Sequence, residues 1–346
     1  MDINELKIKE LDSLKMRESI ISFPNQIDEM LEKFDLYKLK NDYSEIDSIL
    51  ILGMGGSAIG AEICQTLIKT VCHLPIIVSR NYVLPNWVNK KTLVIASSYS
   101  GETEETIESY NQAVLLTENI IIISTGGTLV SLGEKNKNDI FLIPQNYQPR
   151  AAIGFSLMSL LFCLVRLEII NDKVLKEIAS IIKELKYYTN SLSNIDSNNV
   201  AIDLATKLYK TIPVIYGSSQ ITETIALRFR GQLQENSKIS AFHNIVPEMN
   251  HNEIEGWKQN TNNYSIIWLQ DEIDHPQIQK RMNISRKILE EMNIKNYVLK
   301  TNGSIFIERF LKLIILTDWI TFYLAIKNNV DPSPVNTISK LKKMLK

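Results

Sequence analysis

The sequence predicts an α/β fold with two subdomains, each a parallel β-sheet covered by helices on both faces. Short β-branched runs alternate with helical stretches, and this alternation occurs twice along the chain. A length of 346 residues also favours two domains over one. The hydrophobic content of 45% is sufficient for buried cores, so we do not expect a disordered chain.

The first alternation occupies residues 48–170 and follows an N-terminal helical extension, residues 1–47. Apolar strands that alternate with helices are typical of a parallel sheet. The apolar run at 151–165 is shorter than the roughly 20 residues that a bilayer requires, so we expect a buried helix there. The predicted strands lie at 48–52, 75–80, 92–98, 119–125 and 139–144.

A helical connection is expected at 171–210, where a charged segment with helical spacing ends in a Ser/Asn-rich stretch. The second subdomain, residues 211–346, repeats the alternation and closes with a long helix and a short tail helix. The long apolar helix contains charged residues, which favours a core helix over a membrane span. The predicted strands lie at 211–219, 238–243, 265–270 and 297–301, and the predicted helices at 220–233, 276–293 and 305–328.

The composition excludes several classes of protein. Lys plus Arg (38) nearly cancels Asp plus Glu (39), so no global basic field attracts nucleic acid or an anionic membrane. Three cysteines, without CxxC spacing, fit a reducing compartment better than a disulfide framework. The charged N-terminal stretch does not fit a signal peptide. We therefore expect a soluble, cytoplasmic protein.

The loop GMGGSAIG, residues 53–60, follows the first predicted strand and opens a helix. Its spacing differs from the dinucleotide fingerprint, and it lacks the Gly-Lys-Ser/Thr of a Walker loop. Glycines at a helix start let backbone amides approach an anion, with Ser57 at the mouth. The alternative is merely a tight strand-to-helix turn.

The loop SSYSGETEET, residues 97–106, follows the third predicted strand and places three hydroxyl groups around Gly101. Hydroxyls and amides at a helix start can hold a phosphate without a lysine. The alternative is a serine cap in which the glutamates complement the helix dipole. Because loops after the first and third strands of one sheet converge on one crevice, the two loops together favour a phosphate site.

These two loops resemble those of the sugar isomerase (SIS) domain. Three further motifs, QPRAAIG (148–154), LQENSK (233–238) with NHNEIEGW (250–257), and DPSPVNTISKLKK (331–343), narrow the resemblance. Together they resemble the bifunctional phosphoglucose/phosphomannose isomerase family. The resemblance implies two SIS-type α/β/α subdomains. It also implies an isomerase that interconverts glucose 6-phosphate and mannose 6-phosphate with fructose 6-phosphate, without a cofactor.

The resemblance also implies roles for single residues. Glu235 would be the catalytic base, and Arg150 would stabilise the intermediate. His251 would open the sugar ring in the active site of the partner subunit of a homodimer, with Lys340 as its companion. Ser333 stands where the family commonly has a threonine; its hydroxyl is kept, so we expect mannose 6-phosphate to be accepted. The implied substrate-binding residues are Gly55, Gly56, Ser57, Ser98, Ser100, Thr103 and Ser333.

The reaction requires these residue types. Isomerisation moves a proton between C2 and C1 through a cis-enediol(ate), and one carboxylate can serve both carbons. The charge that develops on oxygen needs a fixed cation, which an arginine supplies. Hexose phosphates are mainly cyclic, so an acid/base group such as a histidine must first open the ring. Each residue taken singly could instead be an ordinary surface or capping residue.

The stretch PEMNHNEIEGW, residues 247–257, contains a histidine among three glutamates, which suggests a metal site as an alternative. His251 and Glu253 are two residues apart, which does not place them on one helix face, and HExxH is absent. We therefore expect no metal, and we expect the acidic neighbours to orient or solvate His251.

Two other functions of the protein stay open: an isomerase of another sugar phosphate, and a non-catalytic sugar-phosphate sensor. Against a sensor, residues 1–47 contain no basic recognition helix.

Overall fold

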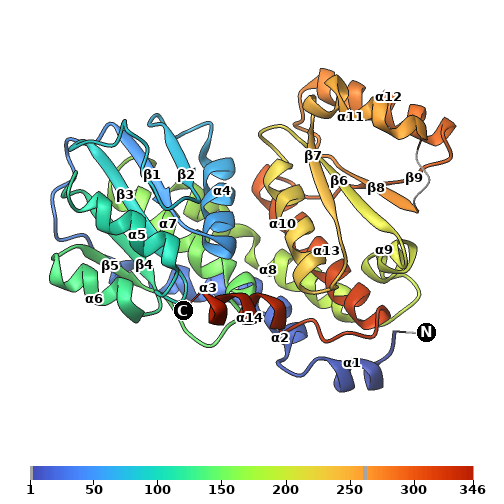
Figure 1. Cartoon of the computed structure of the whole chain (residues 1–346), viewed down its shortest axis with the longest axis horizontal. Helices are drawn as coiled ribbons and strands as arrows, with labels where there is room; N and C mark the ends of the chain where they lie inside the picture. The colour runs from blue at the N-terminus through green and yellow to red at the C-terminus, as the bar shows by residue number, and fades with distance from the viewer. Residues whose placement is uncertain (1–2, 260–262, 346) are drawn as a thin grey trace. The chain divides into compact units, whose positions relative to one another are not determined.

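The computed structural model describes residues 3–259 and 263–345, and the chain divides into two compact units. The first-sheet unit comprises Ser22–Ile182. The second-sheet unit comprises the described residues up to Ile21 and from Lys183 onward. Each unit contains one parallel sheet flanked by helices (Figure 1), which confirms the predicted fold class.

The first sheet has five parallel strands in the order β2-β1-β3-β4-β5. Strand β1 pairs with β2 on one side and with β3 on the other. The order in which strands are added to the sheet therefore reverses between β1 and β3. Such a switch point opens a crevice at the carboxyl ends of the strands. The strands are β1 (Ser48–Leu52), β2 (Ile76–Ser79), β3 (Thr92–Ser98), β4 (Ile120–Ser124) and β5 (Asp139–Leu142).

Both faces of the first sheet are buried. Successive side chains of a strand point to opposite faces, and four successive residues of β1 are all buried. Leu50 and Leu52 pack in a core cluster with residues of α5 and α6. Ile49 and Ile51 are also fully buried, on the face where α4 and α7 pack against each other (Figure 1). These helices are α4 (Gly55–Ile68), α5 (Glu104–Ala113), α6 (Gly127–Lys135) and α7 (Ile153–Arg166).

The second sheet has four parallel strands in the order β7-β6-β8-β9. The strand predicted at 238–243 was wrong in position, because β7 is Phe242–Val246. Lys238 has a left-handed φ of 58°, and the side chain of Gln234 donates a hydrogen bond to the carbonyl of Ala241. The residues before Phe242 therefore form a turn at the end of a helix. The other strands are β6 (Ile212–Ser218), β8 (Tyr264–Leu269) and β9 (Lys295–Leu299).

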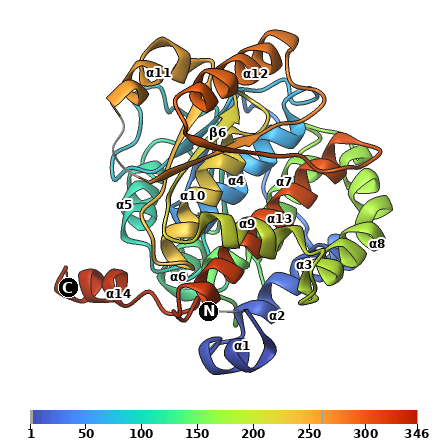
Figure 2. The same ribbon diagram turned by 90° about the vertical axis from the view of Figure 1, so that its right-hand side faces the viewer.

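Helices α9, α10 and α13 lie on one side of the second sheet, and α13 contacts both of the others. Helices α11 and α12 lie on the other side (Figure 2), where Ile254 and Met282 pack against the core cluster around Trp268. The helices of this unit include α1 (Glu5–Leu11), α2 (Met16–Ile21), α9 (Val200–Leu208), α10 (Glu223–Glu235), α11 (Glu253–Gly256), α12 (Pro276–Glu291), α13 (Phe306–Lys327) and α14 (Asn336–Met344).

The buried helix α13 keeps charged side chains inside the protein because these are paired. Asp318 accepts a hydrogen bond of 2.6 Å from Arg228 of α10. Glu308 pairs with Lys312 one turn later. Buried charges are tolerated when they are paired in this way. Among the described residues, no helix combines the length and the apolar character needed to cross a bilayer.

Candidate active site

The turn between β1 and α4 forms the first part of the predicted phosphate site. Gly55 begins α4 with a left-handed φ of 48°, and in the described chain no side chain caps this helix start. The first backbone N–H groups of a helix have no intrahelical partner, so such a start suits an anion. Ser57 is buried, and its Oγ accepts a hydrogen bond of 3.3 Å from the amide of Tyr99 in the neighbouring loop.

The turn between β3 and α5 forms the second part. Ser98 Oγ lies 2.8 Å from Thr103 Oγ1 and accepts a hydrogen bond of 3.1 Å from the amide of Gly101. Ser100 Oγ accepts one of 3.2 Å from the amide of Glu102. Because β1 and β3 are paired neighbours, the structure brings these hydroxyl groups and Ser57 to the same end of the sheet.

The loop after β4 supports this second turn. Gly101 has a left-handed φ of 68°, and a Cβ on it would lie 1.8 Å from the carbonyl oxygen of Gly126, so no larger residue fits. Glu102 accepts hydrogen bonds from the amide of Thr128 at 2.6 Å and from its hydroxyl at 3.0 Å. Glu102 thereby anchors the hydroxyl-bearing turn to the first turn of α6.

Arg150 lies beside the start of α4. It belongs to a short 3₁₀ turn, Pro149–Ala151, and only 5% of it is exposed. A Cβ on Gly56 would lie 2.7 Å from the carbonyl oxygen of Pro149 and 3.5 Å from the Cα of Arg150. Gly56 therefore permits the close approach of the Arg150 segment to the start of α4, in the predicted phosphate site.

Gln26 holds this segment in place, and sequence reasoning missed it. Its amide nitrogen donates to the carbonyl of Ala151 at 2.8 Å, and its amide oxygen accepts from the amide of Gly154 at 3.2 Å. Gln26 is 1% exposed and lies on helix α3 (Phe23–Glu32). A polar residue on an amphipathic helix gives no local signal of a partner 125 residues away.

Glu235 is the last residue of α10, in the second-sheet unit, and is half-buried. The next two residues are completely buried and fix the helix end to α13: Asn236 donates to the hydroxyl of Thr321 at 3.0 Å, and Ser237 to its carbonyl at 2.6 Å. Lys238 donates to the carbonyl of Glu235. The backbone position of Glu235 is therefore rigidly defined.

The segment that contains Ser333 lies against the same helix end. Lys238 Nζ also donates to the carbonyl of Pro334 at 2.7 Å. Ser333 is completely buried, and its amide donates to Asp331 at 2.8 Å. The structure therefore brings the segments of Glu235 and Ser333 together. Lys340, by contrast, lies on the exposed helix α14.

His251 is exposed and ends the 3₁₀ turn Glu248–His251. It belongs to the second-sheet unit, as do Glu235, Ser333 and Lys340. The two turns of the predicted phosphate site and Arg150 belong to the first-sheet unit. Within residues 3–259 and 263–345, no three His, Cys, Asp or Glu side chains are grouped as metal ligands would be.

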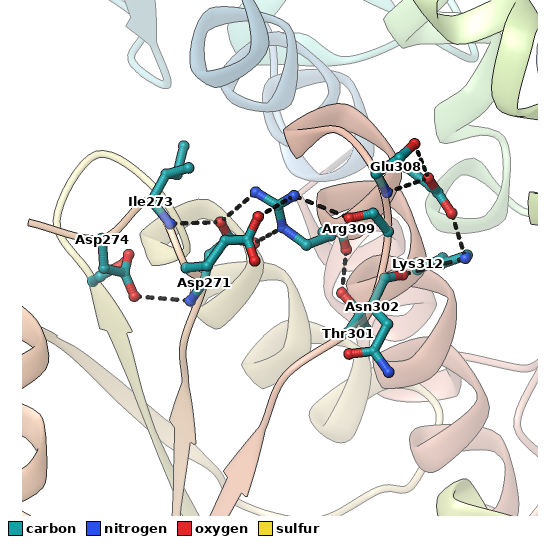
Figure 3. A network of polar contacts seen from close by, with 12 residues as sticks. Asp271, Ile273, Asp274, Thr301, Asn302, Glu308, Arg309 and Lys312 are labelled. Carbon is teal, nitrogen blue, oxygen red and sulfur yellow. Dashed lines mark hydrogen bonds and ion pairs between the residues drawn. The ribbon is translucent and has the colours of Figure 1, made fainter.

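The carboxyl end of the second sheet differs from that of the first. Ser218, which ends β6, donates to Asp274, and Asp274 accepts from the amide of Asp271 at 2.8 Å. Asp271 in turn pairs with Arg309 of α13 through two bonds of 2.9 and 3.0 Å (Figure 3). The Gly-Ser turn of this subdomain is thus engaged in internal contacts with carboxylates.

Comparison with known proteins supports the fold and identifies the family. Residues 197–345 match the model of the bacterial phospho-glucose isomerase C-terminal SIS domain. Among solved structures, the C-terminal domain of glucosamine-fructose-6-phosphate aminotransferase from Francisella tularensis is similar, with a TM-score of 0.72. The match covers 94% of this chain and 99% of that chain at 15% identity, which shows a shared fold.

Two curated relatives are similar along nearly their whole length. The bifunctional phosphoglucose/phosphomannose isomerase of Caldicellulosiruptor bescii is 38% identical over 336 residues, which cover 95% of this chain and 98% of the relative. The enzyme of the same name from Aquifex aeolicus is 33% identical over 318 residues, covering 91% and 95%. At this identity and coverage, the chain belongs to the bifunctional phosphoglucose/phosphomannose isomerase family.

Proposed function

We propose that the protein interconverts glucose 6-phosphate and mannose 6-phosphate with fructose 6-phosphate. One observation carries the proposal beyond family membership: hydroxyl groups, an uncapped helix start and a buried arginine meet at the carboxyl ends of β1 and β3. This combination suits a phosphorylated sugar, because it offers donors for the phosphate and a fixed cation for the sugar end.

In this proposal the phosphate lies between the two turns. The backbone amides of Gly55 and Gly56 and the hydroxyls of Ser57, Ser98 and Ser100 donate hydrogen bonds to it, with Thr103 completing the set. Hydroxyl and amide donors hold a phosphate dianion without a lysine, which fits the absence of a Gly-Lys-Ser/Thr sequence from the first loop.

The chemical step follows from the nature of the reaction. Glu235 takes the proton from C2 and returns it at C1, while Arg150 stabilises the negative charge on the enediolate oxygen. His251 and Lys340 open the hexose ring, with His251 acting in the site of the partner subunit of a cytoplasmic homodimer. The buried Ser333 hydroxyl lies near the reacting carbons and lets both C2 epimers react. Neither a metal nor a cofactor takes part.

Supplying glucose 6-phosphate and mannose 6-phosphate separately, each with EDTA, and measuring fructose 6-phosphate tests the proposal. We expect both to be converted, at rates that EDTA does not change. Binding without conversion would instead indicate a sensor, and conversion of only another sugar phosphate would indicate a different isomerase. Strong loss of activity in EDTA would contradict the metal-independent mechanism.

Glu102 offers a separate test of the phosphate site. Replacing it with alanine removes the hydrogen bonds to Thr128, each contributing about 1 kcal/mol. The hydroxyl-bearing turn then becomes less ordered, and we expect KM for both substrates to rise about tenfold with little change in kcat. Steady-state kinetics measure both constants.

Glu108→Ala is the matched control, because Glu108 is exposed on α5 and accepts a hydrogen bond of 3.2 Å from Gln112 of the same helix. Its KM should stay unchanged. Glu102→Gln keeps an acceptor oxygen for Thr128 and should recover most of the loss. An unchanged KM in Glu102→Ala would contradict the assignment of this turn to phosphate binding.

A further inference from the structure

The segment around His251 combines an exposed histidine with neighbours that are firmly anchored. Met249, two residues earlier, is completely buried in the core cluster of the second sheet. Asn250 donates a hydrogen bond of 2.7 Å to the hydroxyl of Ser285 on α12. The backbone is therefore fixed on the N-terminal side of His251.

Glu253 fixes the other side. Its Oε1 accepts a hydrogen bond of 2.6 Å from the hydroxyl of Tyr216 on β6, and its Oε2 accepts one of 2.6 Å from the side-chain amide of Asn244 on β7. The Tyr216 hydroxyl in turn accepts a bond of 3.0 Å from the indole of Trp257. One carboxylate thus joins this segment to two strands of the sheet.

Burial keeps the hydroxyl of Tyr216 protonated. Tyr216 is completely buried, and its burial, reinforced by the nearby carboxylate of Glu253, raises its pKa. The tyrosine hydroxyl therefore stays protonated and donates to Glu253.

The other two carboxylates of PEMNHNEIEGW make different contacts. Glu255 is exposed and pairs with Lys258 at the surface, three residues away. Glu248 accepts a bond of 3.2 Å from the side chain of Asn252. Glu253 also connects directly to the residue after His251, because its amide donates to Asn252 Oδ1 at 2.6 Å.

We propose that Glu253 is a positioning residue that fixes the backbone on which His251 is presented for ring opening. The inference rests on the proposed role of His251. Proton transfer requires the histidine to lie within hydrogen-bond reach of the ring oxygen, and a displacement of about 1 Å can cost about a hundredfold in rate. An anchored backbone keeps an exposed side chain within that tolerance.

Ring opening can be measured apart from isomerisation. In a Glu235→Gln background, where proton transfer between C2 and C1 is blocked, the protein should still accelerate the interconversion of the α and β anomers of glucose 6-phosphate. NMR exchange spectroscopy measures this rate. His251→Ala in that background should abolish the acceleration, and Glu253→Ala should reduce it about tenfold or more.

The matched control is Glu255→Ala, which removes a carboxylate two residues away and should leave the anomer rate unchanged. Tyr216→Phe removes one donor to Glu253 while keeping the ring, and should cause an intermediate loss. With Glu235 intact, adding Glu253→Ala to His251→Ala should lower the isomerisation rate no further, because the two residues act in one step. A purely structural role for Glu253 would instead lower isomerisation further in that background.

The outcomes separate the two hypotheses. If His251→Ala abolishes the acceleration and Glu253→Ala leaves it unchanged, the positioning role of Glu253 is overturned and the proposed function stands. If His251→Ala itself leaves the acceleration intact, the ring-opening role of His251 fails. Should Glu253→Ala unfold, Glu253→Gln and Tyr216→Phe carry the test, with melting temperatures measured alongside; full anomer rates in both folded variants would overturn the inference.

Discussion

Replacing Glu235 with glutamine should lower kcat for glucose 6-phosphate and mannose 6-phosphate by about a thousandfold, with KM nearly unchanged. A general base contributes typically about 10²–10⁴-fold to a rate, and glutamine keeps the size of the side chain without its basicity. The end of α10 should stay in place, because Asn236 and Ser237 hold it to Thr321. Steady-state kinetics and exchange of the C2 proton with deuterated solvent measure the effect.

Glu291→Gln is the matched control, since Glu291 also ends a helix of the second-sheet unit, α12, and is exposed. Its activity should equal that of the unmodified protein. Solvent exchange at C2 in Glu235→Gln should be undetectable. A Glu235→Gln variant that keeps a tenth of the activity, or that still exchanges the C2 proton, would remove Glu235 as the base.

Breaking the buried pair of Arg309 and Asp271 should strongly destabilise the protein. Both side chains are nearly inaccessible, with exposed fractions of 5% and 7%. Arg309→Met leaves the Asp271 carboxylate buried without its cation, and we expect the free energy of unfolding to fall by about 3–5 kcal/mol. Urea denaturation of the variant, compared with the unmodified protein, measures this change.

The control is Lys207→Met, which breaks the exposed pair of Lys207 and Asp203 on α9. It should change the stability little, because exposed ion pairs contribute little. Adding Asp271→Asn to Arg309→Met removes the unpaired charge and should recover part of the loss. A loss below 1 kcal/mol in Arg309→Met would contradict the structural role of this pair.

The sequence was sufficient for most of the fold because its signals are local. The runs SILIL and TLVIASS are β-branched and lie between turn residues, so their strands could be placed from composition alone. The strand at Phe242–Val246 could not, because FHNIV is partly polar and lies at the edge of its sheet, while the first residues of KISAFH form the turn after α10.

The candidate site, too, could be predicted from the sequence only in part. Glycines and hydroxyls at the ends of two strands predicted the turns around Ser57 and Ser98, which the structure places together. Its supports could not be predicted, because each is a contact between distant segments. Glu102 reaches Thr128 of α6, and Gln26 reaches the segment after Arg150. Neither residue belongs to a periodic pattern that points to its partner.

The missing side chain of Gly56 has a consequence for selectivity. The two backbones are in close contact there: a Cβ added to Gly56 would lie only 2.7 Å from the carbonyl oxygen of Pro149. Under the proposed function, this contact sets the span between the group that holds the phosphate and the cation that meets the reacting carbons. A main-chain distance then determines which length of sugar phosphate can react. Substitutions of neighbouring side chains leave this distance largely unaltered.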